Sequence, residues 1–95
     1  MINRVEMTKS SRKEVEKAPL QVRRKLALWI STVESIGLEE TRRLPSYHDE
    51  QLQGKRQGQR SIRLNLQWRA IYRIKNDGSI EFVEIEEVVP HAYKP

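Results

Sequence analysis

The sequence has no cysteine, and this absence excludes disulfide bonds, thiolate chemistry and sulfur-ligated metal centres together. Histidine is scarce as well, and the spacing of His48 and His91 is not that of a metal site. No apolar run approaches the roughly 20 residues that a membrane-spanning helix needs, and the first residues lack the apolar core of a signal peptide. We therefore expect a cytoplasmic protein in a reducing compartment, without metal, cofactor or membrane partner.

Acidic residues are missing from one stretch of the chain. Between Gln51 and Asn76 there are seven Lys and Arg side chains and no Asp or Glu. The net charge of this stretch is therefore larger than the formal net charge of +5 of the whole chain, because acidic residues elsewhere offset part of it. Cations gathered this densely favour a polyanionic partner such as nucleic acid. With 95 residues in total, the chain is expected to form one domain, residues 1–95, around a small core.

The same stretch has the pattern of a strand pair. From Ile62 to Ile74 the even positions are apolar, and the odd positions are polar or basic except at Ile71. Strict alternation is typical of half-buried strands, so the solvent face of this pair is cationic. A turn at residues 65–67 then places Arg63 opposite Arg69. Like charges in that arrangement destabilise a sheet unless an anion binds between them.

A second turn is expected at residues 76–78, Asn-Asp-Gly, because a three-residue loop with glycine in the left-handed conformation suits this sequence. This loop pairs Tyr72 with Phe82. Beyond Phe82 the alternation fails, and a β-bulge near Val83 would restore it.

The first part of the chain predicts one short strand and two helices. Ile2, Val5 and Met7 belong to the strand, and Ser11 with Glu14 forms a capping box at which a helix begins. That helix ends before Pro19, because proline excludes the helical conformation of the residue that precedes it.

After Pro19, apolar residues recur at intervals of three and four up to Ile36, and Gly37 ends this long amphipathic helix. Residues 38–44 hold one more helical turn. The predicted fold class is α+β: a small twisted antiparallel sheet of about four strands, packed against an N-terminal helical hairpin.

The residue types also suit one kind of chemistry. Cleaving an RNA phosphodiester without metal needs a base, an acid and cations that hold the charge developing on the phosphate. His91 and Tyr93 point to the same side if residues 91–93 are extended, and they could transfer protons there. Two alternatives remain open: an unstructured tail after Pro90, or a solvated arginine face paired with Glu81 and its acidic neighbours.

Two short motifs carry a family resemblance. Residues 52–64 read Leu-Gln-Gly-Lys-Arg-Gln-Gly-Gln-Arg-Ser-Ile-Arg-Leu, and residues 67–72 read Gln-Trp-Arg-Ala-Ile-Tyr. In this order they resemble the RelE/ParE toxin superfamily, and its HigB-like members most. The resemblance implies the RelE-like fold and the toxin role of a type II toxin–antitoxin system. Many members cleave mRNA in the ribosomal A site without metal, and a co-encoded antitoxin neutralises them.

The resemblance also implies roles for individual residues. Arg69 matches the arginine that holds the scissile phosphate, and Lys55 and Arg56 match basic residues of a loop near it. His91 and Tyr93 match the C-terminal catalytic positions. The other basic residues expected to bind substrate are Arg60, Arg63, Arg73 and Lys94, and two further candidates for the site are His48 and Glu50.

The end of the chain departs from the family pattern. Relatives often have adjacent histidine and tyrosine, whereas Ala92 separates His91 from Tyr93 here. Which of the two is the acid therefore stays open, as does the ParE-like branch, which poisons DNA gyrase.

The leading hypothesis is a metal-independent, ribosome-dependent mRNA endonuclease that inhibits translation and growth. The alternatives are a gyrase inhibitor of the same fold and a non-catalytic nucleic-acid-binding module. The expected partners are a cognate antitoxin, the ribosome with its mRNA, and operator DNA bound by the toxin–antitoxin complex.

Overall fold

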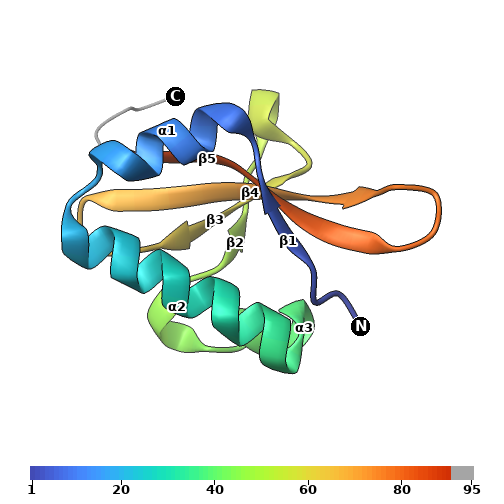
Figure 1. The fold of residues 1–95 in the computed structure, drawn as a ribbon. Helices are drawn as coiled ribbons and strands as arrows, with labels where there is room; N and C mark the ends of the chain where they lie inside the picture. The colour runs from blue at the N-terminus through green and yellow to red at the C-terminus, as the bar shows by residue number, and fades with distance from the viewer. Residues whose placement is uncertain (91–95) are drawn as a thin grey trace.

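The computed structural model describes residues 1–90, in which helices pack against a five-stranded sheet (Figure 1). The strands follow the order β1-β5-β4-β3-β2 across the sheet. β1 is parallel to β5 and the other neighbours are antiparallel, so the α+β prediction is confirmed. The predicted first strand pairs in parallel, and the short strand at residues 50–51 was not predicted. The strands are β1 (Val5–Met7), β2 (Glu50–Gln51), β3 (Gln59–Arg63), β4 (Trp68–Asn76) and β5 (Glu81–Pro90).

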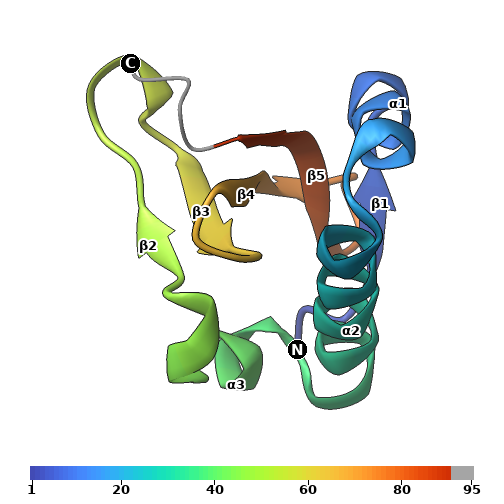
Figure 2. The ribbon, with the colours of Figure 1, turned by 90° about the vertical axis from the view of Figure 1, so that its left-hand side faces the viewer.

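The predicted helical hairpin lies on one side of this sheet, as Figure 2 shows from the side. The break between its two helices falls at Ala18-Pro19, as expected from proline, and Gly37 ends the second helix with a φ of 88°. A short helix follows at once, where one more helical turn was predicted. The helical segments are α1 (Lys9–Lys17), α2 (Leu20–Ile36), α3 (Leu38–Arg42) and the 3-10 turns η1 (Pro45–Tyr47) and η2 (Gly54–Arg56).

The core lies between α2 and the even-numbered side of β3 and β4. Trp29 is fully buried, and its ring centroid lies 5.2 Å from that of Tyr72. The predicted alternation is confirmed for the strands, since their even-numbered side chains from Ile62 to Tyr72 lie in or against this core. Leu66, in the turn between them, is exposed. The core residues of α2 are Val22, Leu26, Trp29 and Val33.

The first predicted turn is also confirmed. Arg63 lies opposite Arg69, and the Asn65 carboxamide closes the turn by accepting hydrogen bonds from the N–H groups of Gln67 and Trp68, both at 2.8 Å. The two arginines therefore do face each other across β3 and β4.

The register of the second hairpin was predicted wrongly. Tyr72 lies opposite Ile85, not Phe82, because residues 77–80 form a longer loop than expected. The Asp77 carboxylate closes this loop by accepting hydrogen bonds from the N–H groups of Ser79 and Ile80, at 2.9 and 3.0 Å. These bonds hold the pKa of Asp77 well below its usual range. The longer loop brings Ile85 into the core.

A β-bulge is present, but at Glu86 and not near Val83. Ile71 lies opposite Glu87 and Tyr72 opposite Ile85, so Glu86 is the extra residue of β5. A bulge re-aims the side chains beside it. The failed alternation directly after Phe82 therefore reflected the longer loop, and the bulge lies further along β5.

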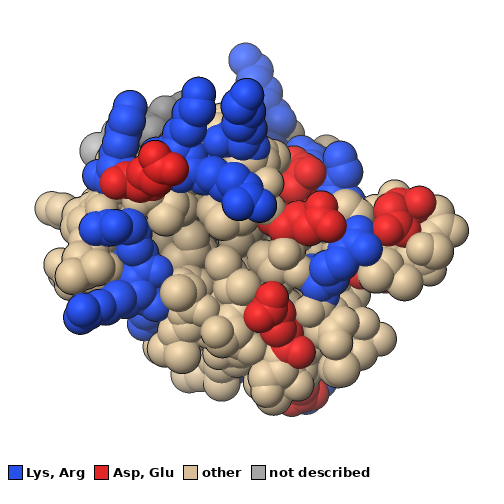
Figure 3. All heavy atoms as spheres, in the orientation of Figure 1, with Lys and Arg blue, Asp and Glu red and all other residues tan. Residues whose placement is uncertain are grey.

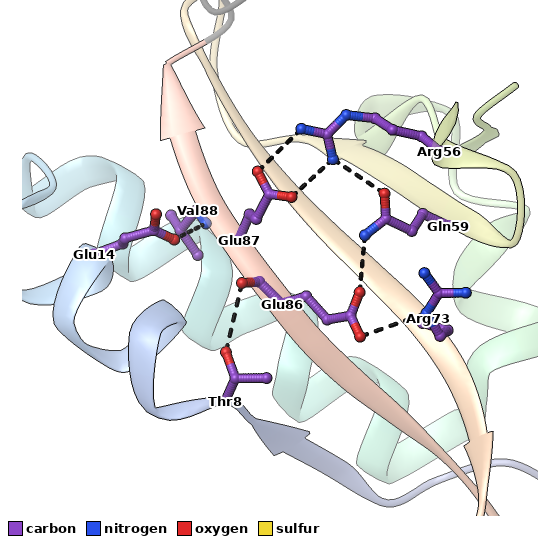
Figure 4. Close-up of polar contacts among 8 residues, drawn as sticks. All are labelled: Thr8, Glu14, Arg56, Gln59, Arg73, Glu86, Glu87 and Val88. Atoms are coloured by element: carbon purple, nitrogen blue, oxygen red, sulfur yellow. Dashed lines mark hydrogen bonds and ion pairs between the residues drawn. The ribbon is translucent and has the colours of Figure 1, made fainter. Parts of the chain in front are cut away.

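α1 holds the edge of β5 at this bulge. Thr8 caps the helix by accepting the N–H of Ser11 at 3.1 Å, so the predicted helix start at Ser11 and its capping box are wrong. Instead, the Ser11 hydroxyl donates to the Ile85 carbonyl at 2.9 Å. The Glu14 carboxylate accepts the N–H of Val88 at 2.8 Å, as Figure 4 shows. These bonds satisfy backbone groups of β5 at Ile85, the last residue that pairs with β1, and beyond it at Val88.

We predict that Ser11→Ala lowers the free energy of unfolding by about 1–2 kcal/mol, because it removes a buried hydrogen bond to the edge of β5. Urea unfolding followed by circular dichroism measures this change. Ser31→Ala, at an exposed position of α2, is the matched control and should change stability by less than about 0.5 kcal/mol. Equal stabilities of the two variants would contradict a role of Ser11 in holding β5.

Candidate functional site

The side of the sheet opposite α2 carries the odd-numbered side chains of β3 and β4. Strand register places acidic side chains of β5 on the same side, and η2 approaches it through Arg56. We call this surface the cationic face, and it consists of Arg56, Gln59, Ser61, Arg63, Arg69, Ile71, Arg73, Glu84, Glu86 and Glu87.

Arg63 and Arg69 lie at the centre of the predicted site. Arg69 is 8% exposed, and its Nη1 donates to the carbonyl oxygens of Asn65 at 3.1 Å and Trp68 at 3.3 Å. Arg63 has a buried Nε that makes no hydrogen bond with any residue of 1–90. The turn between the strands thus fixes one guanidinium, while the buried Nε of the other has no acceptor among residues 1–90.

Arg56 and Arg73 contact carboxylates of β5 (Figure 4). The Arg56 guanidinium binds Glu87 through two nitrogens, at 2.7 and 3.2 Å, and Arg73 Nε lies 3.5 Å from Glu86. Gln59 joins the two pairs, because it accepts from Arg56 at 3.0 Å and donates to Glu86 at 2.8 Å. We call Arg56, Gln59, Arg73, Glu86 and Glu87 the carboxylate network.

The alternative that strand arginines pair with acidic residues of the last strand is therefore correct for Arg73. Its partner is Glu86, whereas Glu81 had been expected. Burial raises the pKa of Glu86, but hydrogen bonds from Gln59 and Glu84 and the charge of Arg73 outweigh it, so the net shift is downward. The hydrogen bond with Glu86, followed by burial, raises the pKa of Glu84. Glu86 is thus the ionised partner that Arg73 binds.

Two other predicted residues lie at the border of the cationic face. Lys55 is exposed in η2 beside Arg56. Glu50 lies opposite Ser61 in the register of β2 and β3, so its side chain belongs to the same side of the sheet. The structure thus brings Glu50 into one cross-strand row with Ser61 and Ile71, which its sequence position alone did not indicate.

Arg60 does not join this group. It lies opposite Tyr72 on the α2 side of the sheet, with its Nε 2.7 Å from the Asp49 carboxylate. The Tyr72 hydroxyl donates to the same carboxylate at 2.5 Å, and the Asp49 side chain is only 1% exposed. Arg60 therefore has a structural partner, and sequence reasoning overlooked Asp49. His48, next to Asp49, is exposed and has a left-handed φ of 45°.

The predicted catalytic residues His91 and Tyr93, and the predicted substrate-binding residue Lys94, lie outside the described residues. Within residues 1–90, no group of three or more His, Asp and Glu side chains is arranged to hold a metal ion. None of the helices in this part of the chain combines the length and apolar character that crossing a bilayer requires.

Sequence reasoning also missed a second group of cations. Figure 3 shows the helix side of the molecule, where blue side chains gather over α1. The exposed basic residues of α1 are Lys9, Arg12, Lys13 and Lys17. A spacing of three or four residues along a helix would have indicated this group.

Solved structures of microbial toxins share this fold. An archaeal RelE–RelB complex from Pyrococcus horikoshii OT3 matches with a TM-score of 0.70 and 19% identity, covering 99% of this chain and 100% of that chain. A YoeB/ParE toxin from Agrobacterium tumefaciens matches with a TM-score of 0.70 and 22% identity, covering 93% and 98%. The DinJ–YafQ toxin–antitoxin complex of E. coli matches with a TM-score of 0.63 and 27% identity, covering 96% of each chain. No protein-family model matches the sequence, and no curated protein matches it significantly.

We predict that Tyr72 makes the protein sensitive to alkali. Burial, together with the charge of Asp49, raises the pKa of Tyr72 above its ordinary value of 10.0, so the folded state keeps a proton that the unfolded state loses. The stability that comes from keeping Tyr72 protonated is therefore fully present below pH 10. Above pH 10 the free energy of unfolding decreases by about 1.4 kcal/mol per pH unit. Urea titrations at neutral and alkaline pH measure it.

Tyr72→Phe is the control for this effect. It should be less stable than the wild type at neutral pH, because the hydrogen bond to Asp49 is lost. Above pH 10 its stability should decrease less steeply. Parallel curves for the two proteins would show that Tyr72 ionises normally.

Proposed function

The chain has the fold of the RelE/ParE toxin superfamily, and on this premise we propose that it is the toxin of a type II toxin–antitoxin system that cleaves mRNA on the ribosome. The observation that carries the proposal is the pair of arginines on adjacent strands, Arg63 and Arg69, on the side of the sheet opposite α2. A cross-strand pair of like charges is unfavourable by itself and becomes favourable when an anion lies between them.

In the proposed reaction, the 2′-hydroxyl of a ribose loses its proton and attacks the adjacent phosphorus, and the 5′-oxygen leaves with a proton. Arg63 and Arg69 hold the phosphate as its negative charge increases. Stabilising charge that develops in the transition state is usually the largest single contribution to catalysis. The Arg69 guanidinium is suited to this role because backbone carbonyls already orient it.

Proton transfer is assigned to His91 and Tyr93, on the family resemblance and on their chemistry. Lys55 is proposed to assist at the phosphate, and Glu50 is the carboxylate whose strand register supports a place at the same site. No metal or cofactor is part of this mechanism.

Substrate binding is assigned to Arg56, Arg63, Arg73 and Lys94. Arg60 is not included, because it binds Asp49 on the other side of the sheet. His48 has no assigned role.

The proposed partners are a cognate antitoxin and the translating ribosome, in the cytoplasm. Two of the similar structures are complexes of a toxin-like chain with a second protein, RelE with RelB and YafQ with DinJ. These complexes support a protein inhibitor. Binding of operator DNA by the toxin–antitoxin pair remains part of the proposal.

We predict that induced expression of the wild-type chain arrests growth and produces new mRNA 5′ ends near codon boundaries. Arg63→Gln and His91→Ala should each reduce cleavage by about 10²–10³-fold, because each removes a group that acts in the transition state. Mapping transcript ends after induction measures the cuts. Arg12→Gln removes the same charge from the exposed surface of α1 and should leave the cleavage pattern unchanged.

Other results would identify the alternatives. DNA breaks and supercoiling defects with intact mRNA would favour a gyrase inhibitor. Normal growth together with salt-sensitive binding of duplex DNA would favour a non-catalytic binding module.

A further inference from the structure

Two of the arginines assigned to the substrate already bind anions supplied by the chain itself. Arg56 holds Glu87 in a two-nitrogen fork, and Arg73 contacts Glu86. Both pairs are partly shielded from water: the side chains of Arg56 and Glu87 are 27% and 30% exposed, and those of Arg73 and Glu86 are 38% and 21% exposed. Ion pairs with this degree of shielding are stronger than pairs in open solvent.

The bulge in β5 explains how two consecutive residues reach the same side. Adjacent side chains in a regular strand point to opposite sides of a sheet. Here Glu86 is the extra residue between Ile85 and Glu87, and both carboxylates contact side chains of the cationic face. Thr8, which caps α1, and Glu14 within α1 bind backbone groups of Glu86 and Val88, so the helix end fixes the backbone of the bulge (Figure 4).

The arrangement resembles the way in which guanidinium groups bind phosphates. An arginine fork binds carboxylate and phosphate with the same geometry, through two parallel N–H donors. Gln59 links the two pairs, because its amide contacts both Arg56 and Glu86. The network therefore has two linked anion positions, each filled by a carboxylate of β5.

We propose that Glu86 and Glu87 are specificity-determining residues that occupy the positions of two RNA phosphates and prevent free single-stranded RNA from binding the cationic face. The inference rests on the proposed function, since it concerns the same face and the same substrate class. A free RNA chain must displace two carboxylates that are tethered to the site. An RNA that a larger assembly holds in place gains additional contacts and can displace them.

The occupant that competes with these carboxylates is a phosphodiester backbone. Strand register places Arg63 and Arg69 on the same side of the sheet as Arg73, with the Ser61–Ile71 pair between them, so cations recur along the path that a phosphodiester backbone would follow. An acidic protein segment is the other polyanion to consider, and the experiment includes it.

The test is the affinity of the double variant Glu86→Gln/Glu87→Gln for a short fluorescent single-stranded RNA, measured by anisotropy. Glutamine keeps the size of the side chain and removes its charge. The variant should bind RNA at least about tenfold more tightly than the wild type, because a hydrogen bond to a charged group contributes about 1.5–3 kcal/mol. The slope of log affinity against log salt should steepen by about 1.4, the value for two added phosphate contacts on a single strand.

The matched control is Glu16→Gln/Glu34→Gln, which makes the same change in net charge at exposed positions on the helices. It reports the effect of overall charge alone. Equal RNA affinities of the two double variants would overturn the proposal. Tighter binding of poly-L-glutamate by the Glu86/Glu87 variant, with RNA affinity unchanged, would also overturn it, because the site would then select acidic protein segments.

Binding is measured without cleavage or toxicity, so failure of the proposed function and failure of this inference give different results. Thermal unfolding checks that each variant is folded. If the double variant is unfolded, the single variant Glu87→Gln replaces it and should gain about half of the increase in log affinity.

Discussion

The attachment of α1 to the edge of β5 is the constraint on which the rest of the structure depends. Ser11 and Glu14 bind the backbone on either side of the extra residue Glu86, and so they fix both the bulge and the register of the residues after it. The core and the cationic face both follow from this register. Ile85 lies in the core, while the bulge after it places the carboxylates of Glu86 and Glu87 on the other side of the sheet.

The basic residues of the chain oppose folding of the sheet but favour the binding of anions. Seven cations in one stretch without an acidic residue repel one another when the strands assemble. Glu86 and Glu87 compensate part of this repulsion, while the Arg63 Nε has no acceptor within the described part of the chain. The acidic end of the chain therefore stabilises the sheet and also sets how strongly the basic stretch attracts other anions.

Local patterns predicted the part of the fold that depends on neighbours in sequence. The alternation from Ile62 to Ile74 and the turn at Asn65 gave the first hairpin with its register. Arg60 was wrongly expected to bind substrate, although it is an even position, and extending the alternation back by two residues would have placed it on the apolar side. The second hairpin was predicted with the wrong register because Asp77 closes a longer loop than the three residues Asn-Asp-Gly suggest. The position of the bulge was not predictable from β5, since it depends on side chains of α1.

The hydrogen bonds from α1 to β5 also determine at which stage of synthesis the sheet can fold. Ser11 and Ile85, like Glu14 and Val88, are 74 positions apart in the chain. Contacts between such distant residues form late, and a ribosome releases the N-terminal helices long before the final strand. A nascent chain therefore has its helices but not its ordered row of arginines. The ability to bind a polyanion in register appears only when synthesis of the described part is nearly finished, so a truncated product has the charge of the protein without its binding geometry.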